Sequence, residues 1–551
     1  MKNLLKYFII LLFTGNLWGQ TSQFNWPLDS PRTITGNYGE LRPNHFHAGL
    51  DFSTGGRVNK AVFAAADGFV SRVKVSAGGY GNNLYITHPN GKVSVYAHLN
   101  SFYGELAAFV KKMQYKKESF EIDEYLSPEQ FPVNKRKLIG LSGNSGSSTA
   151  PHLHFEIRDE KSEVPLNPLK YYLVQDNQHP VLERVAFYNL ADTSSPKFLQ
   201  SLKIKNIGNH QYQVIKDSVV LTQGILGLAF SGYDKSYVNG NHNNIYSAKV
   251  YFDNMLIHAH KLEEISFDDS RFVNEFSELA EKHKFQKCFV PTLYPPGIYE
   301  RRPTKGRILL SDTNFHTLKL VVMDEFNNET SLTFTFKTRK LNYYAKPSIN
   351  SDVYVDCTED LMISKKKLQI FIPAHTFYYS TGLIFENTLE TSGKIIILPR
   401  ESNLKSTCII GFEVPNKYKK VKDKLLLNSG SYHIPPIVKR DSVFYSVKNL
   451  GSFLIEVDTV NPKIKTKIPL AKLKSLKTAK HLDFSISDNL SGIYKYRLTI
   501  NNKWVLAEYD AKSHKLVYLF DEQTPRGKLI IHLEVEDRVG NKEVLKFESV
   551  R

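Results

Sequence analysis

Two histidines separated by one residue, His152 and His154, stand in the segment TAPHLHFEIRD. The apolar residues Leu153, Phe155 and Ile157 alternate with polar ones there, and this period of two is typical of a half-buried β-strand. Residues i and i+2 of a strand lie about 6.7 Å apart and point to the same side. The two imidazoles can therefore share one site without both binding the same atom.

A histidine pair of this kind is a weak signal by itself, because the sequence contains the pattern three times. The other two pairs are His45/His47 and His258/His260. Stronger support comes from NHFHAGLDFST, about a hundred residues upstream, where His47 and Asp51 are four positions apart. On a straight strand they would lie about 13 Å apart, whereas two ligands of one zinc ion lie within about 3.5 Å of each other. If both bind, the chain must turn between them, and Gly49 is where a turn meets least resistance.

These candidate ligands predict a catalytic rather than a structural metal site. His47, Asp51 and one histidine of the pair would leave the fourth position of a tetrahedral zinc ion open. Such an ion lowers the pKa of its bound water to about 7 and polarises a carbonyl oxygen. The remaining histidine of the pair can then hydrogen-bond the water or the oxyanion, and His98 lies on a strand-like run that ends at a loop. Because the sequence has no His-Glu-x-x-His motif, histidine must do the acid–base work that glutamate does there.

Four motifs occur together in the order and style of one protein family. They are NYGELRPNHFHAGLDF, AADGFV, GGYGNNLYITHPNGKVSVYAHL and IGLSGNSGSSTAPHLHFEIR. Over about residues 24–172 the sequence resembles the lysostaphin/LytM-like zinc endopeptidases, and the combination of motifs is highly specific. The resemblance implies a compact β-structured domain of the duplicated hybrid motif type. It further implies a groove in which Zn²⁺-dependent hydrolysis cleaves peptide bonds of peptidoglycan cross-links.

The same resemblance assigns roles to individual residues. It implies that the zinc ligands are His47, Asp51 and His154. It implies that His98 and His152 are the catalytic pair that orients the water and stabilises the tetrahedral intermediate.

Two departures from the family bear on the substrate. Ala150 stands where the family usually has glycine before Pro-His, which could narrow the approach to the site. An insertion at about residues 101–137 replaces a short connection, and we expect it to form a wall or lid with a short helix. Substrate choice therefore cannot be carried over from the family.

Other residues near the motifs have simpler interpretations. We expect His45 to line the groove or the surface, and His88 to be a turn histidine. Glu156 and Arg158 share the polar face of their strand, and they either support the ligands or form a plain ion pair. His258/His260 lies outside this block and has no aspartate partner, so we expect it at the surface.

Short alternating runs separated by turn signals predict an all-β fold for the whole chain. An internal echo joins HTLKLVVMDEFNNETSLTFTF (316–336) to GKLIIHLEVEDRVGNKEVLKF (527–547). Each copy has two alternating strands joined through an Asp-x-x-x-Asn spacing, at Asp324/Asn328 and Asp537/Asn541. Such repeats are typical of β-sandwiches, and we expect immunoglobulin-like ones.

From these patterns we predict the following segments. They are a signal peptide (1–20), a zinc endopeptidase domain (21–178), a linker (179–208), an immunoglobulin-like β-sandwich (209–340), a β-rich domain (341–461) and a second immunoglobulin-like β-sandwich (462–551). As a hypothesis, residues 179–551 fold independently and are not needed for bond cleavage itself. The segment from Asp234 to Asn244 is expected to be a polar turn, because it lacks the spacing of a known calcium loop.

The N-terminus predicts export. Lys2 and Lys6 precede an apolar run from Tyr7 to Phe13, which is typical of a signal peptide and too short to span a membrane. No later stretch reaches about 18 apolar residues, so we predict no transmembrane segment. The mature protein is therefore expected in the periplasm or outside the cell.

The charge and the cysteines narrow the class of protein further. Removing residues 1–20 takes away two lysines and no acids, so the net charge falls from +17 to +15. We interpret the lysine-rich segments as solvated strand faces rather than as sites for anionic polymers, and we predict no nucleic-acid partner. Three widely spaced cysteines allow at most one disulfide, which excludes a disulfide-stapled scaffold.

Several functions remain open at this stage. The first is an exported zinc endopeptidase whose substrate is a peptidoglycan peptide, with C-terminal β domains for binding or regulation. The second is a non-enzymatic wall-binding regulator of other hydrolases, and the third is a peptidase for extracellular proteins. The presence of all five site residues favours an enzyme over a regulator, which would have no need to keep them.

Overall fold

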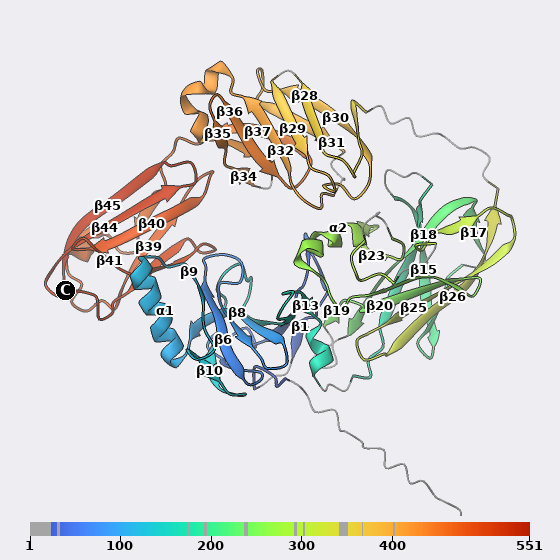
Figure 1. The fold of residues 1–551 in the computed structure, drawn as a ribbon, viewed down its shortest axis with the longest axis horizontal. Coiled ribbons are helices and arrows are strands. Elements are labelled where there is room, and N and C mark those ends of the chain that lie inside the picture. Colours follow the sequence, from blue (N-terminus) through green and yellow to red (C-terminus); the bar gives the residue numbers. More distant parts are fainter. Residues whose placement is uncertain are drawn as a thin grey trace, which may run out of the picture.

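The computed structural model is built mainly of β-strands, and the predicted all-β fold class is confirmed (Figure 1). The structure describes residues 24–29, 33–172, 176–191, 196–216, 218–235, 241–290, 295–300, 304–340, 351–365, 367–399, 403–430 and 432–551. The predicted signal peptide lies outside these residues. Buried apolar side chains form a core in each of four successive parts of the described chain. We call these parts the N-terminal domain (24–172), the middle domain (176–340), the third domain (351–457) and the C-terminal domain (458–551).

The N-terminal domain contains one large antiparallel sheet in which the site-bearing strands are neighbours. Its main path is β1 (Ile34–Gly36), β4 (Leu50–Ser53), β12 (His152–Asp159), β8 (Lys92–Phe102), β7 (Asn82–Thr87), β6 (Gly68–Val75) and β10 (Pro132–Val133). Strands off this path are β5 (Ala61–Phe63), β9 (Ile122–Tyr125), β11 (Leu138–Ser142) and β13 (Pro165–Leu166). A separate hairpin joins β2 (Leu41–Arg42) to β3 (His45–Phe46), and the 3-10 helix η1 (Pro168–Tyr171) closes the domain. This order places β4, β12 and β8 side by side.

The predicted insertion at 101–137 contains helix α1 (Gly104–Lys117) and strands β9 and β10. Leu106 and Val110 of α1 are buried in the core of the N-terminal domain. The other side of the helix contacts the C-terminal domain, where the Tyr115 hydroxyl donates to Asp521 Oδ2 at 2.6 Å. The insertion is therefore a contact surface between two domains.

The middle domain begins earlier than the sequence predicted. The segment 179–208, predicted as a linker, contains β14 (Val181–Asn189) and β15 (Lys197–Gly208). The linker prediction is wrong, because β14 pairs with both β15 and β18 and buries Val185 and Phe187 in the core of this domain. A strand in the interior of a sheet cannot serve as a connection between domains.

The sheet of the middle domain runs in the order β21-β20-β25-β26-β16-β15-β14-β18-β23-β22. The remaining strands of this path are β16 (Gln211–Val214), β18 (Gly224–Lys235), β20 (Ser247–Phe252), β21 (Met255–Lys261), β22 (Ser277–Ala280), β23 (His283–Lys287), β25 (Phe315–Met323) and β26 (Glu329–Arg339). Off the path lie β17 (Val219–Thr222), β19 (His242–Asn243) and β24 (Ile308–Leu310). The 3-10 helix η2 (Phe267–Phe272) and the short helix α2 (Val273–Phe276) precede β22.

Each of the last two domains has two sheets that share a core. In the third domain the first sheet runs in the order β27 (Val353–Val355), β30 (Thr381–Thr388), β31 (Lys394–Leu398), β37 (Gly451–Val457), β33 (Leu425–Asn428) and β34 (His433–Ile434). The second sheet runs in the order β28 (Leu361–Lys365), β29 (Leu368–Ile372), β32 (Cys408–Glu413), β36 (Ser442–Val447) and β35 (Ile437–Lys439). In the C-terminal domain the first sheet runs in the order β38 (Lys463–Thr466), β39 (His481–Ser487), β43 (Lys515–Leu519) and β42 (Ala507–Asp510). The second sheet runs in the order β41 (Lys503–Trp504), β40 (Ile493–Ile500), β44 (Lys528–Asp537) and β45 (Lys542–Val550). The 3-10 helices are η3 (Asn416–Lys424) and η4 (Leu470–Lys474). Two sheets around one core make these domains β-sandwiches.

The middle domain and the N-terminal domain share a hydrophobic cluster. Tyr38 and Phe46 of the N-terminal domain pack with Phe272 and Phe276 of the middle domain, and Tyr378 of the third domain joins the same cluster. Phe46 directly precedes His47 in the chain. The hypothesis that residues 179–551 fold independently does not fit this shared core.

The second histidine pair is part of that region and corrects another expectation. His258 and His260 are 2 % and 1 % exposed, and the His258 Nε2 and His260 Nδ1 atoms are 2.9 Å apart. The His260 ring packs on the edge of Phe276. The predicted surface position is wrong, because aromatic side chains from distant segments cover the pair.

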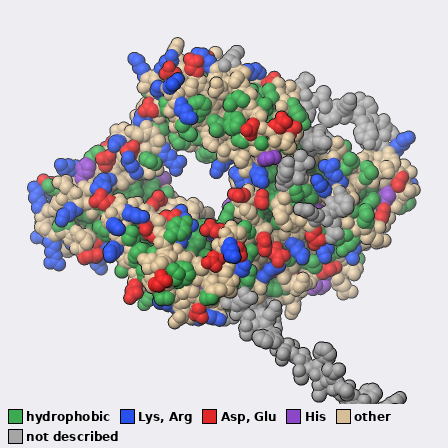
Figure 2. All heavy atoms as spheres, in the orientation of Figure 1, with side chains coloured by type: hydrophobic (Ala, Val, Ile, Leu, Met, Phe, Trp, Pro, Cys, Tyr) green, Lys and Arg blue, Asp and Glu red, His purple; other side chains and the backbone are tan. Residues whose placement is uncertain are grey.

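The cysteines and the charged side chains agree with what the composition indicated. Cys288, Cys357 and Cys408 are buried free thiols. Figure 2 shows basic and acidic side chains intermixed over one face of the molecule, around a central opening between the domains. The lysine-rich helix η3 buries none of its side chains, as expected for a solvated segment. Among the described residues, no helix has the length and apolar character needed to cross a membrane.

Candidate metal centre and active site

Three neighbouring strands bring the predicted site residues together. On one side of β12, His154 lies opposite Asp51 of β4; on the other side it lies opposite Ala97 of β8. His98 follows Ala97 directly, and His152 stands two positions before His154 on the same side of β12. Three imidazoles and one carboxylate therefore meet over three adjacent strands.

His47 reaches the same place because the chain bends between β3 and β4. A Cβ atom on Gly49 would lie 2.2 Å from the backbone oxygen of Phe155. Glycine is thus required for close passage against β12, and its φ is not in the left-handed region. The bend predicted between His47 and Asp51 is present, although the physical reason is space rather than an unusual backbone angle.

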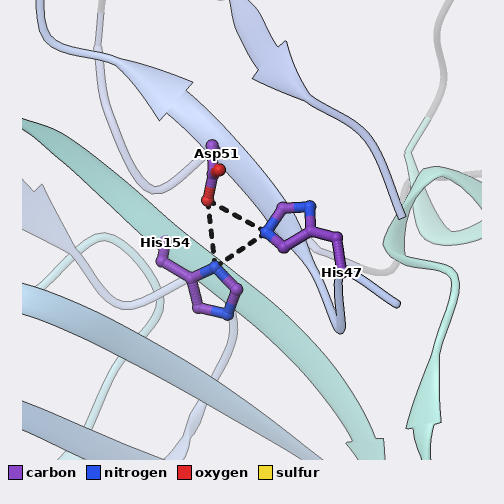
Figure 3. A group of neighbouring side chains, drawn as sticks. All are labelled: His47, Asp51 and His154. Atoms are coloured by element: carbon purple, nitrogen blue, oxygen red, sulfur yellow. Dashed lines mark hydrogen bonds and ion pairs between the residues drawn. The ribbon is translucent and has the colours of Figure 1, made fainter. Parts of the chain in front are cut away.

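The three predicted ligands form a compact triangle (Figure 3). His47 Nε2 lies 3.1 Å from Asp51 Oδ1 and 3.0 Å from His154 Nδ1. His154 Nδ1 lies 2.9 Å from Asp51 Oδ1. Two ligand atoms on a tetrahedral zinc ion stand about 3.3–3.5 Å apart. Two imidazole nitrogens and one carboxylate oxygen at these separations fit zinc after an outward shift of a few tenths of an ångström.

Each imidazole is held from behind by an acceptor. His47 Nδ1 donates to the backbone oxygen of Asn37 at 2.7 Å, and His154 Nε2 donates to Glu156 Oε1 at 2.9 Å. With these bonds in place, His47 Nε2 and His154 Nδ1 face the triangle, where each can offer a lone pair to a metal ion. Acceptors of this kind are the usual outer partners of metal-bound histidines.

Arg42 holds the carboxylate of the triangle. Its Nη2 donates to Asp51 Oδ2 at 2.5 Å, which leaves Oδ1 for the triangle. Burial opposes the charge on Asp51, but the neighbouring rings of His47, His152 and His154 lower the pKa of its carboxyl well below the usual value. The Asp51 carboxylate is therefore anionic at neutral pH.

The triangle favours a positive charge at His154. Burial opposes protonation of this ring, but hydrogen bonds to Asp51 and Glu156 raise its pKa to about 9. A metal ion at Nδ1 would replace that proton, since metal ligands must be deprotonated. The acidic neighbours thus favour a positive charge at this position, whether a proton or a metal ion.

Glu156 contacts both the predicted ligand His154 and Arg158, so the structure has the contacts that both interpretations from the sequence require. Its Oε2 accepts from Arg158 Nε at 2.6 Å, and its Oε1 also accepts a hydrogen bond from the Tyr80 hydroxyl. Burial opposes its charge, yet Arg158 and His154 lower the pKa of Glu156 to about 2. The fully buried carboxylate therefore remains ionised behind His154.

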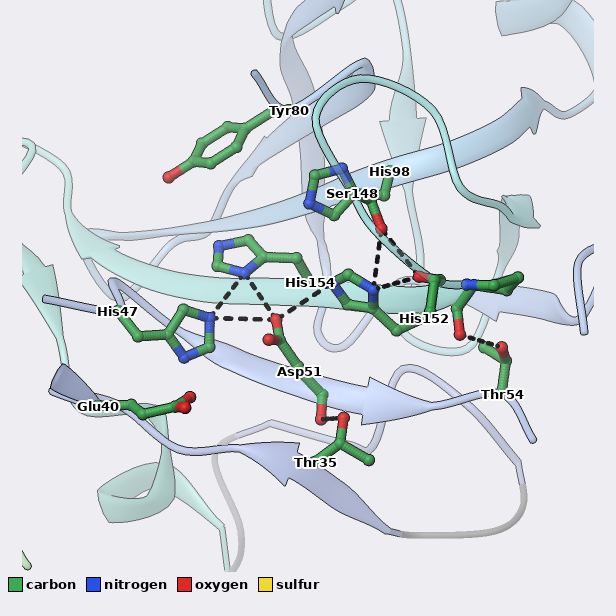
Figure 4. A network of polar contacts seen from close by, with 12 residues as sticks. Thr35, Glu40, His47, Asp51, Thr54, Tyr80, His98, Ser148, His152 and His154 are labelled. Carbon is green, nitrogen blue, oxygen red and sulfur yellow. Dashed lines mark hydrogen bonds and ion pairs between the residues drawn. The ribbon is translucent and has the colours of Figure 1, made fainter. Parts of the chain in front are cut away.

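His152 stands beside the triangle (Figure 4). Its Nδ1 lies 2.8 Å from the Ala150 backbone oxygen and 3.2 Å from Ser148 Oγ. Its Nε2 lies 3.4 Å from Asp51 Oδ1. With Nδ1 donating to Ala150, the lone pair of Nε2 faces the metal position.

His98 completes the group of five predicted residues. Its Nδ1 donates to the Ser145 backbone oxygen at 2.9 Å, and its ring centroid lies 4.9 Å from that of His152. The backbone of His98 is left-handed, with φ at 59°, at an irregularity in the pairing of β8. Burial, His154 and His152 lower the pKa of His98 to about 3, so the ring is neutral at pH 7.

Sequence reasoning missed three supporting residues. Asn37, Arg42 and Tyr80 lie inside the quoted motifs, but their spacing gave no sign of which atoms they contact. His45 is exposed, as expected. His88 is 3 % exposed, and its two nitrogens contact Asp67 O and Ser94 Oγ, both at 2.7 Å, so it anchors a buried turn.

The C-terminal domain touches the rim of this site. Lys512 Nζ donates to the Ser148 backbone oxygen at 2.9 Å and to that of Asn144. The Ser148 hydroxyl in turn contacts His152. A residue more than 350 positions away thus steadies the loop that carries Ala150.

Comparisons with known proteins agree with the N-terminal geometry. Residues 45–116 match the model of peptidase family M23. The predicted resemblance to the lysostaphin/LytM-like zinc endopeptidases is confirmed. The matched stretch includes His47, Asp51 and His98, whereas His152 and His154 lie beyond it.

Two curated relatives and one solved structure illustrate the similarity. The DD-carboxypeptidase/endopeptidase Mpg of Neisseria meningitidis serogroup B is 33% identical over 127 residues, which are 23% of this chain and 23% of that protein. The murein hydrolase activator NlpD of Salmonella typhimurium is 30% identical over 150 residues, 27% of this chain and 31% of that protein. The catalytic domain of the antimicrobial peptidase lysostaphin from Staphylococcus simulans is 22% identical, with 25% of this chain and 91% of that one covered and a TM-score of 0.20. The chain spans about a quarter of the length of the first curated relatives that it matches.

Proposed function

We propose that the protein is an exported zinc metalloendopeptidase that hydrolyses peptide bonds in peptidoglycan cross-links. The observation that carries the proposal is the triangle of His47 Nε2, Asp51 Oδ1 and His154 Nδ1, whose sides measure 2.9–3.1 Å. His98 and His152 lie beside it, as a hydrolytic site requires. The match to a zinc-dependent peptidase family supports the same conclusion.

The chemistry divides between the metal and two histidines. When bound at the triangle, a zinc ion would supply a Lewis acid that polarises a carbonyl and lowers the pKa of water to about 7. His152 and His98 each use Nδ1 to donate to a backbone oxygen, so each keeps a lone pair on Nε2. His152 Nε2 accepts a proton from the attacking water and returns it to the leaving amine. The neutral ring of His98 orients the same water.

The second candidate is a regulator that acts on other wall hydrolases. The Salmonella relative is named a murein hydrolase activator, and this name supports the second candidate. The five converging side chains argue for the enzyme, because a regulator needs neither an open metal position nor two imidazoles beside it. A peptidase for extracellular proteins would use the same groups and differs only in its substrate.

Digestion of purified peptidoglycan tests the proposal. The full-length protein in excess zinc is expected to release new amino termini from cross-link peptides, which mass spectrometry identifies. The matched control is His152→Ala, which keeps the three ligands. If the wild type releases no new termini but raises the activity of an added hydrolase, the regulator is the correct function.

Export is part of the proposal. The lysines and apolar run at 1–20 support removal of a signal peptide, and a wall substrate places the protein in the periplasm or outside the cell. Amino-terminal sequencing of the secreted protein is expected to begin near residue 20 or 21. An intact Met1 in the exported fraction would contradict this.

A further inference from the structure

Two clusters of carboxylates lie outside the candidate active site. In each cluster, one oxygen atom of every aspartate lies within 4.8 Å of the corresponding atoms of the others. The middle-domain cluster is Asp176, Asp234 and Asp324, and the C-terminal cluster is Asp458, Asp488 and Asp537.

An asparagine organises the middle-domain cluster. Asp324 Oδ1 accepts from the Asn328 backbone nitrogen at 2.8 Å, and Asp324 Oδ2 accepts from Asn328 Nδ2 at 2.7 Å. The same Nδ2 donates to the Asp176 backbone oxygen at 2.9 Å. This amide fixes the first and third aspartates relative to each other.

The C-terminal cluster has the same bonds at the equivalent positions. Asp537 accepts from the Asn541 backbone nitrogen at 2.8 Å and from Asn541 Nδ2 at 2.6 Å. That Nδ2 donates to the Asp458 backbone oxygen at 3.0 Å. The Asp-x-x-x-Asn echo in the sequence is therefore one element of a three-aspartate arrangement that occurs twice.

Each cluster joins the segment that enters a domain to two strands of that domain. Asp176 precedes β14, Asp234 stands near the end of β18, and Asp324 follows β25 directly. In the C-terminal domain the three aspartates hold the corresponding places at β38, β39 and β44. Both clusters thus lie where one domain joins the next.

One buried oxygen in each cluster has no hydrogen-bond partner. Asp234 is 4 % exposed, and its Oδ1 accepts no hydrogen bond; the Oδ1 atom of Asp488 is orphaned in the same way. A buried polar atom left without a partner costs about 1–3 kcal/mol, and a charged one costs more. The same atom orphaned in both copies indicates a shared ligand rather than a local defect.

The middle-domain cluster has one more carboxylate beside it than its C-terminal counterpart. Glu325 is a fourth carboxylate, and Arg538 takes its place in the C-terminal domain. The middle-domain cluster should therefore attract a cation more strongly than its counterpart.

We propose that Asp176, Asp234 and Asp324 bind a calcium ion, and that the C-terminal cluster is a second, weaker site of the same kind. A set of carboxylate oxygens suits a hard divalent cation, whereas zinc prefers the nitrogen-rich triangle described above. Calcium binds oxygens at about 2.3–2.6 Å, so two of its ligands can stand almost 5 Å apart. The separations within each cluster fall inside this span.

The middle-domain site also lies against the N-terminal domain. Glu325 Oε1 accepts from Asn37 Nδ2 at 3.3 Å and from Asn167 Nδ2 at 3.4 Å. Asn37 is the residue whose backbone oxygen holds His47. Calcium would therefore hold the middle domain next to Asn37, which orients the proposed zinc ligand His47.

Calcium titration of the full-length protein tests the proposal. The protein is passed over a chelating resin and reloaded with zinc, and calcium binding is then measured by calorimetry and elemental analysis. The wild type is expected to bind two calcium ions, Asp234→Asn one and Asp234→Asn/Asp488→Asn none, with zinc content unchanged. Asp268→Asn, which removes an exposed carboxylate of the same domain, is the matched control and should bind two.

Thermal unfolding separates a calcium site from a purely structural cluster. Asparagine places no charge in the buried position, so Asp234→Asn should unfold at the same or a higher temperature than the wild type without calcium. In 1 mM calcium the wild type should gain several degrees and the variant less. The middle site is overturned if the wild type binds no calcium, or if Asp234→Asn binds as much as the wild type. A wild type that binds one ion, lost in Asp234→Asn, supports the middle site and overturns the second.

Discussion

Replacing Glu156 with glutamine removes one charge behind a proposed zinc ligand and keeps the shape of the side chain. The carboxylate is fully buried, and it accepts from His154 Nε2 at 2.9 Å and from Arg158 Nε at 2.6 Å. Loss of an outer partner of a metal-bound histidine usually weakens metal binding 10–100-fold, which is about 1.4–2.8 kcal/mol. We therefore expect Glu156→Gln to bind zinc 10–100-fold more weakly than the wild type.

The same change should lower the free energy of unfolding. Arg158 is 7 % exposed and would lose its carboxylate partner. Breaking a buried ion pair costs about 3–5 kcal/mol, and the oxygen retained by glutamine favours the lower end of that range. The control is Glu160→Gln, which neutralises an exposed carboxylate on the same segment.

Competition with a chromophoric chelator measures zinc affinity, and thermal unfolding in excess zinc measures stability. The two readouts distinguish weaker zinc binding from general unfolding. Excess zinc should restore zinc occupancy in a folded variant, but it should not restore the stability that the broken ion pair removes. An unchanged zinc affinity in folded Glu156→Gln would refute the reasoning that this carboxylate orients His154.

Further predictions concern packing, acid stability and domain independence. Gly49→Ala should lower the free energy of unfolding by about 1–3 kcal/mol or more and reduce zinc content, because its Cβ would lie 2.2 Å from the Phe155 backbone oxygen. Circular dichroism and metal analysis measure the two effects, and wild-type stability and zinc content in the variant would contradict this prediction. Burial lowers the pKa of His258 far below its usual value and that of His260 to about 3. Below about pH 6.5 the folded state therefore binds fewer protons than the unfolded state. As the pH is lowered through this range, the free energy of unfolding should decrease by up to about 1.4 kcal/mol per pH unit for each histidine. The double replacement by phenylalanine should flatten this slope, and an identical slope in wild type and variant would contradict the burial argument. Residues 21–178 expressed alone should be less stable than the full chain and aggregate through the exposed cluster at Phe46; a stable, zinc-loaded fragment would show that the shared core is dispensable.

Much of the site was predictable because its signals are local. The period of two around His152 and His154 identified a strand, and the short spacing of His47 and Asp51 required a bend at Gly49. The structure brings these side chains together at the expected distances. The contacts of Asn37, Arg42 and Tyr80 were not predictable, because they depend on which distant atoms the fold places beside them.

The errors in the fold prediction have physical reasons as well. Strand β15 is mostly exposed, so the segment 197–208 lacks the apolar alternation by which buried strands are recognised. The pair His258/His260 is covered by Phe276 and Tyr299, which come from other segments.

Asp234 was assigned to a polar turn because no calcium-loop spacing surrounds it, whereas its two neighbours in the cluster, Asp176 and Asp324, come from two other segments of the chain. Residues 236–240 of that segment lie outside the described residues. Within each cluster only the Asp-x-x-x-Asn spacing is local in the sequence, and it does not reveal the two distant aspartates that the fold brings beside it.

The most direct test of the central claim compares His154→Ala with His152→Ala for zinc content and turnover of a cross-link peptide. His154→Ala should lose zinc and activity together, because two remaining ligands rarely hold the ion at working concentrations. His152→Ala should keep about one zinc per chain and lose about 10²–10⁴ in turnover, the usual contribution of a positioned acid–base group. If His152→Ala sheds the metal while His154→Ala keeps it, the assignment of ligand and catalytic neighbour on β12 is contradicted.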